Sequence, residues 1–152
     1  MNSIYIHFPF CQRRCTYCDF FARAGMARFI PEYIESVIRE MKLVSNASGE
    51  KPPVHTVYIG GGTPSLMAPY QVQNLLDTIR QEYDLKDDVE ISMEANPGTV
   101  SREKVFAFRQ AGINRISYGV QSFQPAELKL LGRIHTAEEV KTAVELSREA
   151  GF

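Results

Sequence analysis

The sequence of 152 residues is long enough for one domain with its own core, since a chain of this size buries roughly two-thirds of its extended surface on folding. With 44% hydrophobic and 23% charged residues and a net charge of −1, the composition excludes a disordered chain, collagen and a coiled coil, and it has no basic excess that would favour nucleic acid or anionic lipid. No apolar run approaches the ~20 residues of a membrane span and no signal stretch opens the sequence, so we expect a cytoplasmic protein with no membrane span and no nucleic-acid partner.

Four short segments rich in β-branched and aromatic residues alternate with four segments of helical periodicity. The sequence predicts, in chain order, a strand at 3–8, a helix at 30–47, a strand at 54–59, a helix at 69–83, a strand at 89–94, a helix at 101–111, a strand at 115–121 and a helix at 136–150. Strands that alternate with helices form parallel sheets through right-handed crossovers. We therefore expect an α/β fold, either doubly wound or curled into a barrel.

Capping residues support the last two predicted helices. Ser101 and Thr136 are N-cap residues, and Thr136 with Glu139 matches a capping box. Gly112 and Gly151 stand where the same helices should end, because glycine readily adopts the left-handed conformation that closes a helix.

The predicted strands alternate apolar and polar residues. In the first strand, Ile4 and Ile6 alternate with Tyr5 and His7. A parallel sheet covered on both faces would instead read as nearly continuous apolar residues. We therefore expect an apolar face packed on helices and a polar face that lines a cavity, as in part of a barrel with a ligand inside. A small parallel sheet with one solvated face is the alternative.

The chain holds about four strand–helix units. After the last predicted helix only Gly151 and Phe152 follow, where a fifth strand would begin. We therefore expect residues 1–152 to form one core domain that is truncated at its C-terminal side and leaves a strand edge exposed.

Three cysteines, Cys11, Cys15 and Cys18, lie together after the first predicted strand. An odd number at such short spacing does not suit a disulfide framework. Thiolates are the usual ligands of iron–sulfur clusters, so we expect the three to hold a cluster that keeps one iron open to a substrate or cofactor. Structural zinc with His7 as fourth ligand, and cysteines buried on a helix face, are the alternatives.

Unusual residues follow the other strands as well, at the carboxyl ends where functional groups gather in parallel folds. The three glycines at 60–62 match neither common phosphate-binding motif and indicate a close backbone approach. Glu94 and Gln121 end the third and fourth strands on the polar face, and Arg133 follows them. A tight turn, solvated strand ends and a surface cation are the simpler alternatives for these features.

Five strings of residues, in order along nearly the whole chain, carry a family resemblance. They are CQRRCTYC at 11–18, GGGTP at 60–64, MEANPGT at 93–99, NRISYGVQSF at 114–123 and LGRIH at 131–135. The first two resemble the radical S-adenosylmethionine (SAM) superfamily. The other three are similar to its HemN/HemW group, the oxygen-independent coproporphyrinogen oxidases and their haem-chaperone relatives.

The resemblance implies a radical SAM core domain, a partial (βα)6 TIM-like barrel that binds a 4Fe-4S cluster and SAM. Cys11, Cys15 and Cys18 match the cluster ligands, and the open iron would chelate the amino and carboxylate groups of SAM. Reductive cleavage of SAM would then start radical chemistry.

Further motif positions imply contacts with SAM. The residues at these positions are Tyr5 near the sulfonium, Tyr17 beside the adenine, Gly61, Gly62 and Thr63 at the methionine amino end, and Glu94, Gln121 and Arg133. From charge and hydrogen-bonding capacity, we assign Glu94 to the ammonium, Arg133 to the carboxylate and Gln121 to the ribose hydroxyls.

One position separates the two branches of the resemblance. The oxidases carry a further cysteine two residues after the third ligand, where this sequence has Phe20, and Cys18-Asp19-Phe20 resembles the haem-chaperone branch. This branch implies a haem or porphyrin ligand, haem-accepting client proteins and an electron donor. His7, His55 and His135 are candidate haem ligands by residue type alone. A coproporphyrinogen III oxidase and a non-catalytic, zinc-stabilised binding module are the alternatives.

Overall fold

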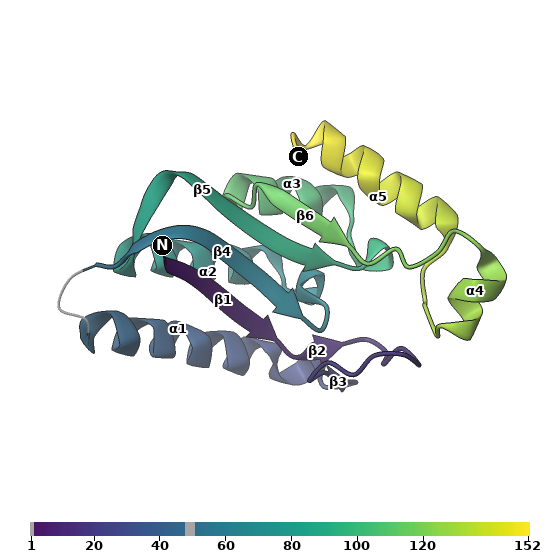
Figure 1. Cartoon of the computed structure of the whole chain (residues 1–152), viewed down its shortest axis with the longest axis horizontal. Helices are drawn as coiled ribbons and strands as arrows, with labels where there is room; N and C mark the ends of the chain where they lie inside the picture. Colours follow the sequence, from purple (N-terminus) through teal and green to yellow (C-terminus); the bar gives the residue numbers. More distant parts are fainter. Residues whose placement is uncertain (1, 48–50) are drawn as a thin grey trace.

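A four-stranded parallel sheet forms the centre of the computed structural model, which describes residues 2–47 and 51–152 (Figure 1). The strands lie in the order β1 (Asn2–Phe8), β4 (Pro53–Gly61), β5 (Asp84–Ala95) and β6 (Arg115–Tyr118). Their spatial order follows their sequence order, so each crossover adds the next strand on the same side. This winding confirms the predicted partial barrel, because a doubly wound sheet reverses its strand order.

Three crossover helices pack along one face of the sheet (Figure 1). They are α1 (Ile30–Ala47), α2 (Pro69–Glu82) and α3 (Arg102–Ala111), and α5 (Ala137–Glu149) follows beside α3. No helix in the described parts of the chain is both long and apolar enough to cross a bilayer.

The short elements follow the carboxyl ends of the strands or precede the helices. They are β2 (Phe10–Cys11), β3 (Arg23–Ala24), the 3-10 helices η1 (Ala27–Phe29), η2 (Pro64–Leu66) and η3 (Pro97–Thr99), and α4 (Pro125–Leu130). β2 pairs with β3 in a separate two-stranded sheet. These segments surround the end of the sheet at which the candidate site lies.

The strand register explains the two faces of the sheet. Ile6, Ile59, Met93 and Ile116 are register partners across all four strands, and their side chains face the helices, where the first three are buried. One position earlier, Tyr5, Tyr58, Ser92 and Arg115 are partners on the opposite face. The predicted alternation therefore gives one apolar and one polar face.

Two strand boundaries differ from the sequence prediction by three or more residues. β5 begins at Asp84 instead of 89, because Asp84 and Leu85 pair with Pro53 and Val54 before a register shift. β6 ends at Tyr118 instead of 121, and the chain then turns sharply, with a positive φ of 64° at Gln121. Both differences arise from pairing and turn geometry that hydrophobic periodicity does not report.

The predicted caps of the last helices are present. Ser101 Oγ accepts a hydrogen bond from Lys104 N at 3.3 Å, and Gly112 closes α3 with φ 112°. At α5, Thr136 Oγ1 accepts from Glu139 N at 3.2 Å while the Glu139 carboxylate accepts from Thr136 N at 2.7 Å. This reciprocal pair satisfies two amide groups that the helix itself leaves without partners.

We expect Thr136→Ala to lower the free energy of unfolding by about 1 kcal/mol, because alanine supplies no oxygen to the cap. Urea denaturation of the full chain measures the change. Thr142→Ala, an exposed substitution inside α5, is the control and should leave the stability equal or slightly higher, since alanine favours the helix interior. Equal losses in the two variants would contradict a role for the cap.

Candidate functional site

A cavity of about 300 Å³ opens at the carboxyl ends of the four parallel strands. Its walls come from the loop after β1, the ends of β4 and β5, the turn after β6 and the segment after α4. The predicted site residues that line it are Cys11, Cys15, Tyr17, Cys18, Gly61, Gly62, Thr63, Glu94, Gln121 and Arg133. The structure therefore brings together residues from five separate segments, and Tyr5 is the predicted site residue that lies outside this lining.

The cysteine loop is attached to the opposite wall of the cavity by hydrogen bonds. Thr16 N donates to the Leu131 carbonyl at 3.2 Å, and Thr16 Oγ1 donates to the Leu130 carbonyl at 3.1 Å. Within the loop, Cys18 N donates to the Cys15 carbonyl at 3.2 Å. These bonds fix the loop although it contains no regular helix.

All three thiols are free and half-buried. Cys11 Sγ accepts from Thr63 Oγ1 at 3.5 Å, and Cys15 Sγ accepts from Arg133 Nη1 at 3.4 Å. Burial raises the pKa of the Cys11 thiol, while the hydrogen bond from Thr63 acts in the opposite direction. The sulfurs thus contact groups on different walls of the cavity.

This donor set suits an iron–sulfur cluster better than a single metal ion. Cluster ligands are thiolates, and the loop supplies three of them to one cavity. Within residues 2–47 and 51–152, no three His, Cys, Asp or Glu side chains form a group that could hold one ion. His7, the fourth ligand of the zinc alternative, has both ring nitrogens in hydrogen bonds, with Tyr5 and with the Phe21 carbonyl. The zinc alternative therefore gains no support.

The glycines after β4 allow two backbone segments to pass very close to each other. Gly62 N donates to the Phe8 carbonyl at 2.6 Å, and a Cβ on Gly62 would lie 2.5 Å from the Phe10 carbonyl oxygen. Gly61 has φ 113°, a conformation that side chains other than glycine rarely adopt. The close approach predicted from these glycines is therefore, at Gly62, an approach of the protein's own backbone.

Glu94 presents a carboxylate to the cavity without a cationic partner in the described structure. Its oxygens accept from Tyr58 Oη at 2.7 Å and from Gly61 N at 2.9 Å, both neutral donors. Burial, followed by the hydrogen bond to Glu94, raises the pKa of Tyr58 to about 12, so this hydroxyl remains a donor at neutral pH. The two donors orient the carboxylate and leave its charge available to a cation.

Arg133 is the corresponding cation, and its contacts in the described structure include no carboxylate. Its Nη1 donates to Cys15 Sγ and, at 3.5 Å, to Tyr17 Oη, while Nη2 donates to the Gly119 carbonyl. Its buried Nε has no hydrogen-bond partner among the described residues. One cavity therefore holds a carboxylate and a guanidinium that do not neutralise each other, which suits the ammonium and carboxylate of an amino acid.

Gln121 reaches the cavity from the turn after β6. A Cβ added to Gly119 would lie 3.3 Å from Arg133 Nη2 and 3.4 Å from Gln121 Nε2, which shows that both side chains crowd the same glycine. Gly119 thus leaves room for two of the predicted contact residues.

Tyr5 lies on the polar face of β1 and is 60% exposed. Its hydroxyl bonds to His7 Nδ1 at 2.9 Å, and its ring stacks on Tyr58 with centroids 6.2 Å apart. Tyr5 is therefore connected to the cavity through Tyr58, whose hydroxyl donates to the Glu94 carboxylate.

The lining also contains residues that the sequence analysis did not assign to the site. Asn96 and Ser117 are among them. Ser117 is the register partner of Glu94, so the strand alternation would have identified it. Asn96 sits in a turn in which its side chain accepts from Gly98 N, and no periodicity predicts its place.

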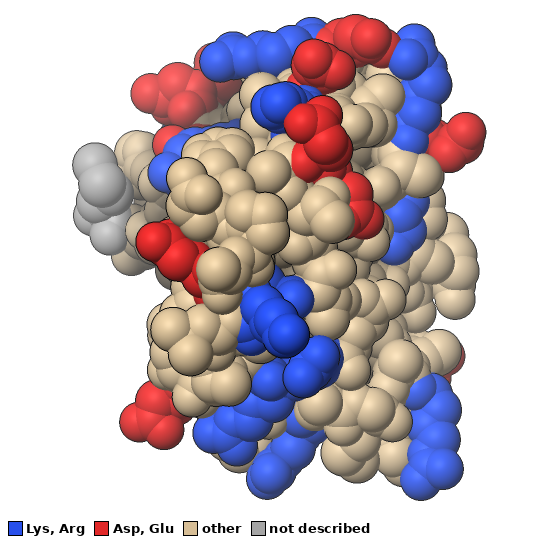
Figure 2. Space-filling model, turned by 90° about the vertical axis from the view of Figure 1, so that its right-hand side faces the viewer, with Lys and Arg blue, Asp and Glu red and all other residues tan. Residues whose placement is uncertain are grey.

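Arginines surround the cysteine loop. Figure 2 shows this end of the molecule, with Lys and Arg side chains over its lower half. Residues 11–28 carry four exposed arginines and one carboxylate, that of Asp19. The arginines are Arg13, Arg14, Arg23 and Arg28. Such an excess of positive charge would offset the negative charge of a thiolate-bound cluster.

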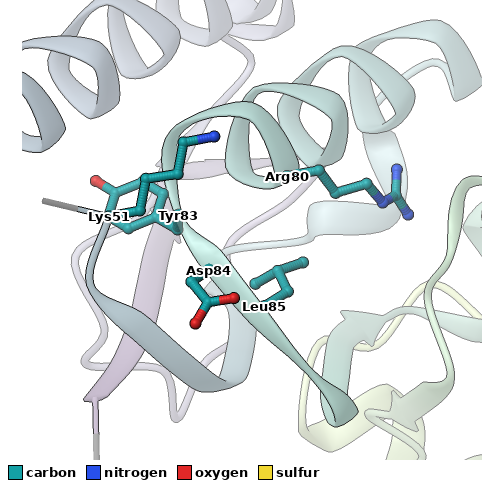
Figure 3. A pocket seen from close by; sticks show the side chains of 5 residues that line it. All are labelled: Lys51, Arg80, Tyr83, Asp84 and Leu85. Atoms are coloured by element: carbon teal, nitrogen blue, oxygen red, sulfur yellow. The ribbon is translucent and has the colours of Figure 1, made fainter.

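A larger hollow of about 590 Å³ lies at the opposite end of the sheet, beside the start of β5 (Figure 3). Three of its polar side chains are already engaged. Arg80 pairs with Asp77 at 2.9 Å, Tyr83 donates to the main chain of α1, and Asp84 pairs with Lys86. The hollow is lined by Lys51, Arg80, Tyr83, Asp84 and Leu85, and this lining lacks the thiols of the first cavity.

Comparison with known proteins finds relatives along nearly the whole chain. The family model described as the radical SAM superfamily matches residues 5–152. The heme chaperone HemW of Escherichia coli (strain K12) is 44% identical over 153 residues, which cover 99% of this chain and 40% of the relative. Radical S-adenosyl methionine domain-containing protein 1, mitochondrial, of Mus musculus is 38% identical over 143 residues, or 90% of this chain and 31% of the relative.

Among solved structures, coproporphyrinogen III oxidase (HemN) of Escherichia coli, described as a radical SAM enzyme, superimposes with a TM-score of 0.87. It is 28% identical, and the match covers 99% of this chain and 35% of that one. The chain thus spans about 40% or less of the length of these relatives. It belongs to the radical SAM superfamily.

Proposed function

We propose that this chain binds a 4Fe-4S cluster through Cys11, Cys15 and Cys18 and binds SAM in the same cavity, within a protein that carries haem to its clients. The observation that carries the proposal is the convergence, in one cavity, of three free thiols with the unpaired charges of Glu94 and Arg133. When bound and reduced, the cluster would supply the electron that cleaves the sulfonium of SAM.

Each charged group of the methionine part of SAM is bound by a side chain of opposite charge. Glu94, which Tyr58 and Gly61 orient, binds the ammonium. Arg133 binds the carboxylate: its Nη groups are hydrogen-bonded to the protein, and its Nε has no hydrogen-bond partner among the described residues. Gln121 takes the ribose hydroxyls.

The remaining predicted contacts keep their assignments. Tyr17 lies beside the adenine, Gly61, Gly62 and Thr63 border the methionine amino end, and Tyr5 lies toward the sulfonium. Tyr5 acts there through its stacked neighbour Tyr58, since it does not line the cavity itself.

The haem role is supported by the relatives and by one residue. The E. coli relative that is 44% identical is named a heme chaperone, and Phe20 lines the cavity where the oxidases carry a further cysteine. We therefore favour haem delivery to client proteins over coproporphyrinogen decarboxylation.

Titration of the full-length protein with haem should shift the Soret band, and an assay with coproporphyrinogen should detect no decarboxylation. An unchanged Soret band would count against the haem role, and decarboxylation would favour the oxidase.

We expect Arg133→Lys to weaken SAM binding about tenfold, because lysine keeps the charge but loses the planar fork that pairs with a carboxylate. Equilibrium dialysis against labelled SAM, with the full-length protein reconstituted anaerobically, measures the dissociation constant. The iron content should remain that of the wild type, because Arg133 is not a cluster ligand. Unchanged SAM affinity would contradict the assignment of Arg133 to the carboxylate.

A further inference from the structure

His135 is a buried histidine beside the cavity, 3% exposed, in the segment between α4 and α5. Both of its ring nitrogens have partners. Nε2 lies 3.1 Å from the Val120 carbonyl oxygen, and Nδ1 lies 3.3 Å from Arg133 Nη2. His135 thus connects the turn after β6 with the arginine that we assign to SAM.

These partners determine the protonation state of the ring. A carbonyl oxygen can only accept, so Nε2 must carry the hydrogen, and a guanidinium can only donate, so Nδ1 must offer its lone pair. The ring is therefore neutral. Burial, with the charge of Arg133 as the second cause, also lowers the pKa of His135 below its ordinary value.

The turn that His135 holds is unusual. Gln121 has φ 64°, and in the described structure it is the one residue other than glycine with a positive φ. This conformation is unfavourable for an L-residue, so neighbouring contacts must stabilise it. Val120 supplies them, since its N donates to the Tyr118 carbonyl at 2.9 Å and its carbonyl accepts from Ser122 N at 2.8 Å as well as from His135.

Arg133 is held by the same arrangement. Its Nη2 donates to the Gly119 carbonyl and points at His135 Nδ1. Arg133 and His135 therefore bond to the carbonyls of two consecutive residues, 119 and 120, directly before Gln121.

We propose that His135 is a positioning residue of the SAM site: its neutral imidazole fixes the Arg133 guanidinium and the Gln121 turn relative to each other, so that the carboxylate and the ribose of one ligand are bound together. This inference rests on the proposed binding of SAM. His135 itself does not line the cavity that holds the cysteines.

Two substitutions separate the two bonds of the ring. In His135→Asn, the carboxamide oxygen stands near the place of Nδ1 and can accept from Arg133, but the shorter side chain does not reach Val120. In His135→Gln, the carboxamide nitrogen stands near the place of Nε2 and can donate to the Val120 carbonyl. His135→Leu removes both bonds and keeps an apolar side chain of comparable size.

We expect His135→Leu to weaken SAM binding about tenfold, and His135→Asn and His135→Gln about threefold each, in the full-length, anaerobically reconstituted protein. Equilibrium dialysis measures the affinity. The electron paramagnetic resonance spectrum of the reduced cluster, recorded with and without SAM, is the second readout. It should change less on SAM addition in the leucine variant, and iron content should be unchanged throughout. Asn74→Leu, at an exposed position of α2 outside the cavity lining, is the control and should bind SAM like the wild type.

The outcomes separate this inference from the proposed function. If the wild type binds no SAM, the proposed function fails and this inference fails with it. If the wild type binds SAM and His135→Leu binds equally well, the positioning role alone is overturned. If the asparagine and glutamine variants bind no better than the leucine variant, the ring acts by packing and the hydrogen-bond role is overturned. Should the leucine variant fail to fold, wild-type affinity and spectra in both other variants would overturn the role.

Discussion

Cys18→Ser is expected to reduce the iron and sulfide content of the anaerobically reconstituted protein at least about fivefold from the roughly four irons and four sulfides per chain of a 4Fe-4S cluster. The sequence contains three cysteines and all three lie in the cavity, so the loss of one leaves two thiol ligands. Serine remains a protonated alcohol at neutral pH and does not replace a thiolate. Cys18 is the best position for this test because its sulfur, unlike those of Cys11 and Cys15, takes part in no hydrogen bond that the structure describes.

Chemical analysis of iron and sulfide, together with the broad visible absorbance of the cluster, measures this effect. Gln12→Ala is the control, since Gln12 is exposed in the same loop and carries no ligand atom for iron. It should keep the iron content of the wild type. A wild-type protein that stays colourless and takes up zinc would contradict the cluster and favour the zinc-stabilised module.

Local sequence features predicted the elements of the fold well, because each depends on residues close together in the chain. The alternation of Ile4 and Ile6 with Tyr5 and His7 indicated the two faces of the sheet, and the capping box at Thr136 located the start of α5. The features that were missed depend on distant partners. β2 forms only because β3 lies beside it, thirteen residues further on, and the extension of β5 to Asp84 requires its pairing with Pro53.

The composition of the site was predictable to a similar extent. The cysteine spacing and the family strings identified ten of the nineteen residues that line the cavity, all three thiols included. The connections among them were not predictable, because they join residues far apart in sequence: Tyr58 orients Glu94 across 36 positions, and Arg133 reaches Cys15 across 118. Burial and hydrogen bonding of His135 likewise appear only once α4 and the turn after β6 are placed.

Glu94→Gln is expected to weaken SAM binding on the order of 100-fold, the larger of the predicted effects on affinity. Removal of a charged hydrogen-bond partner costs about 1.5–3 kcal/mol, and 1.4 kcal/mol corresponds to a factor of ten in the dissociation constant. Glutamine has nearly the same shape: its carbonyl oxygen can accept from Gly61 N, and its NH2 group can donate to Tyr58 Oη, so the side chain keeps its place and the fold is retained. The lost affinity therefore reports the charge of Glu94 and not its packing.

Glu90→Gln provides a matched control on the same strand and the same face. Glu90 lies four residues before Glu94 in β5, outside the cavity lining, and its carboxylate pairs with Arg115 at 3.6 Å and accepts from Ser92 Oγ at 2.7 Å. An exposed ion pair of this kind contributes little, so this variant should bind SAM with nearly wild-type affinity. Equal losses in the two variants would show that the overall charge of the polar face attracts SAM. A loss confined to Glu94→Gln would show that one carboxylate, without an ion-pair partner and held by two neutral donors, binds the ammonium directly.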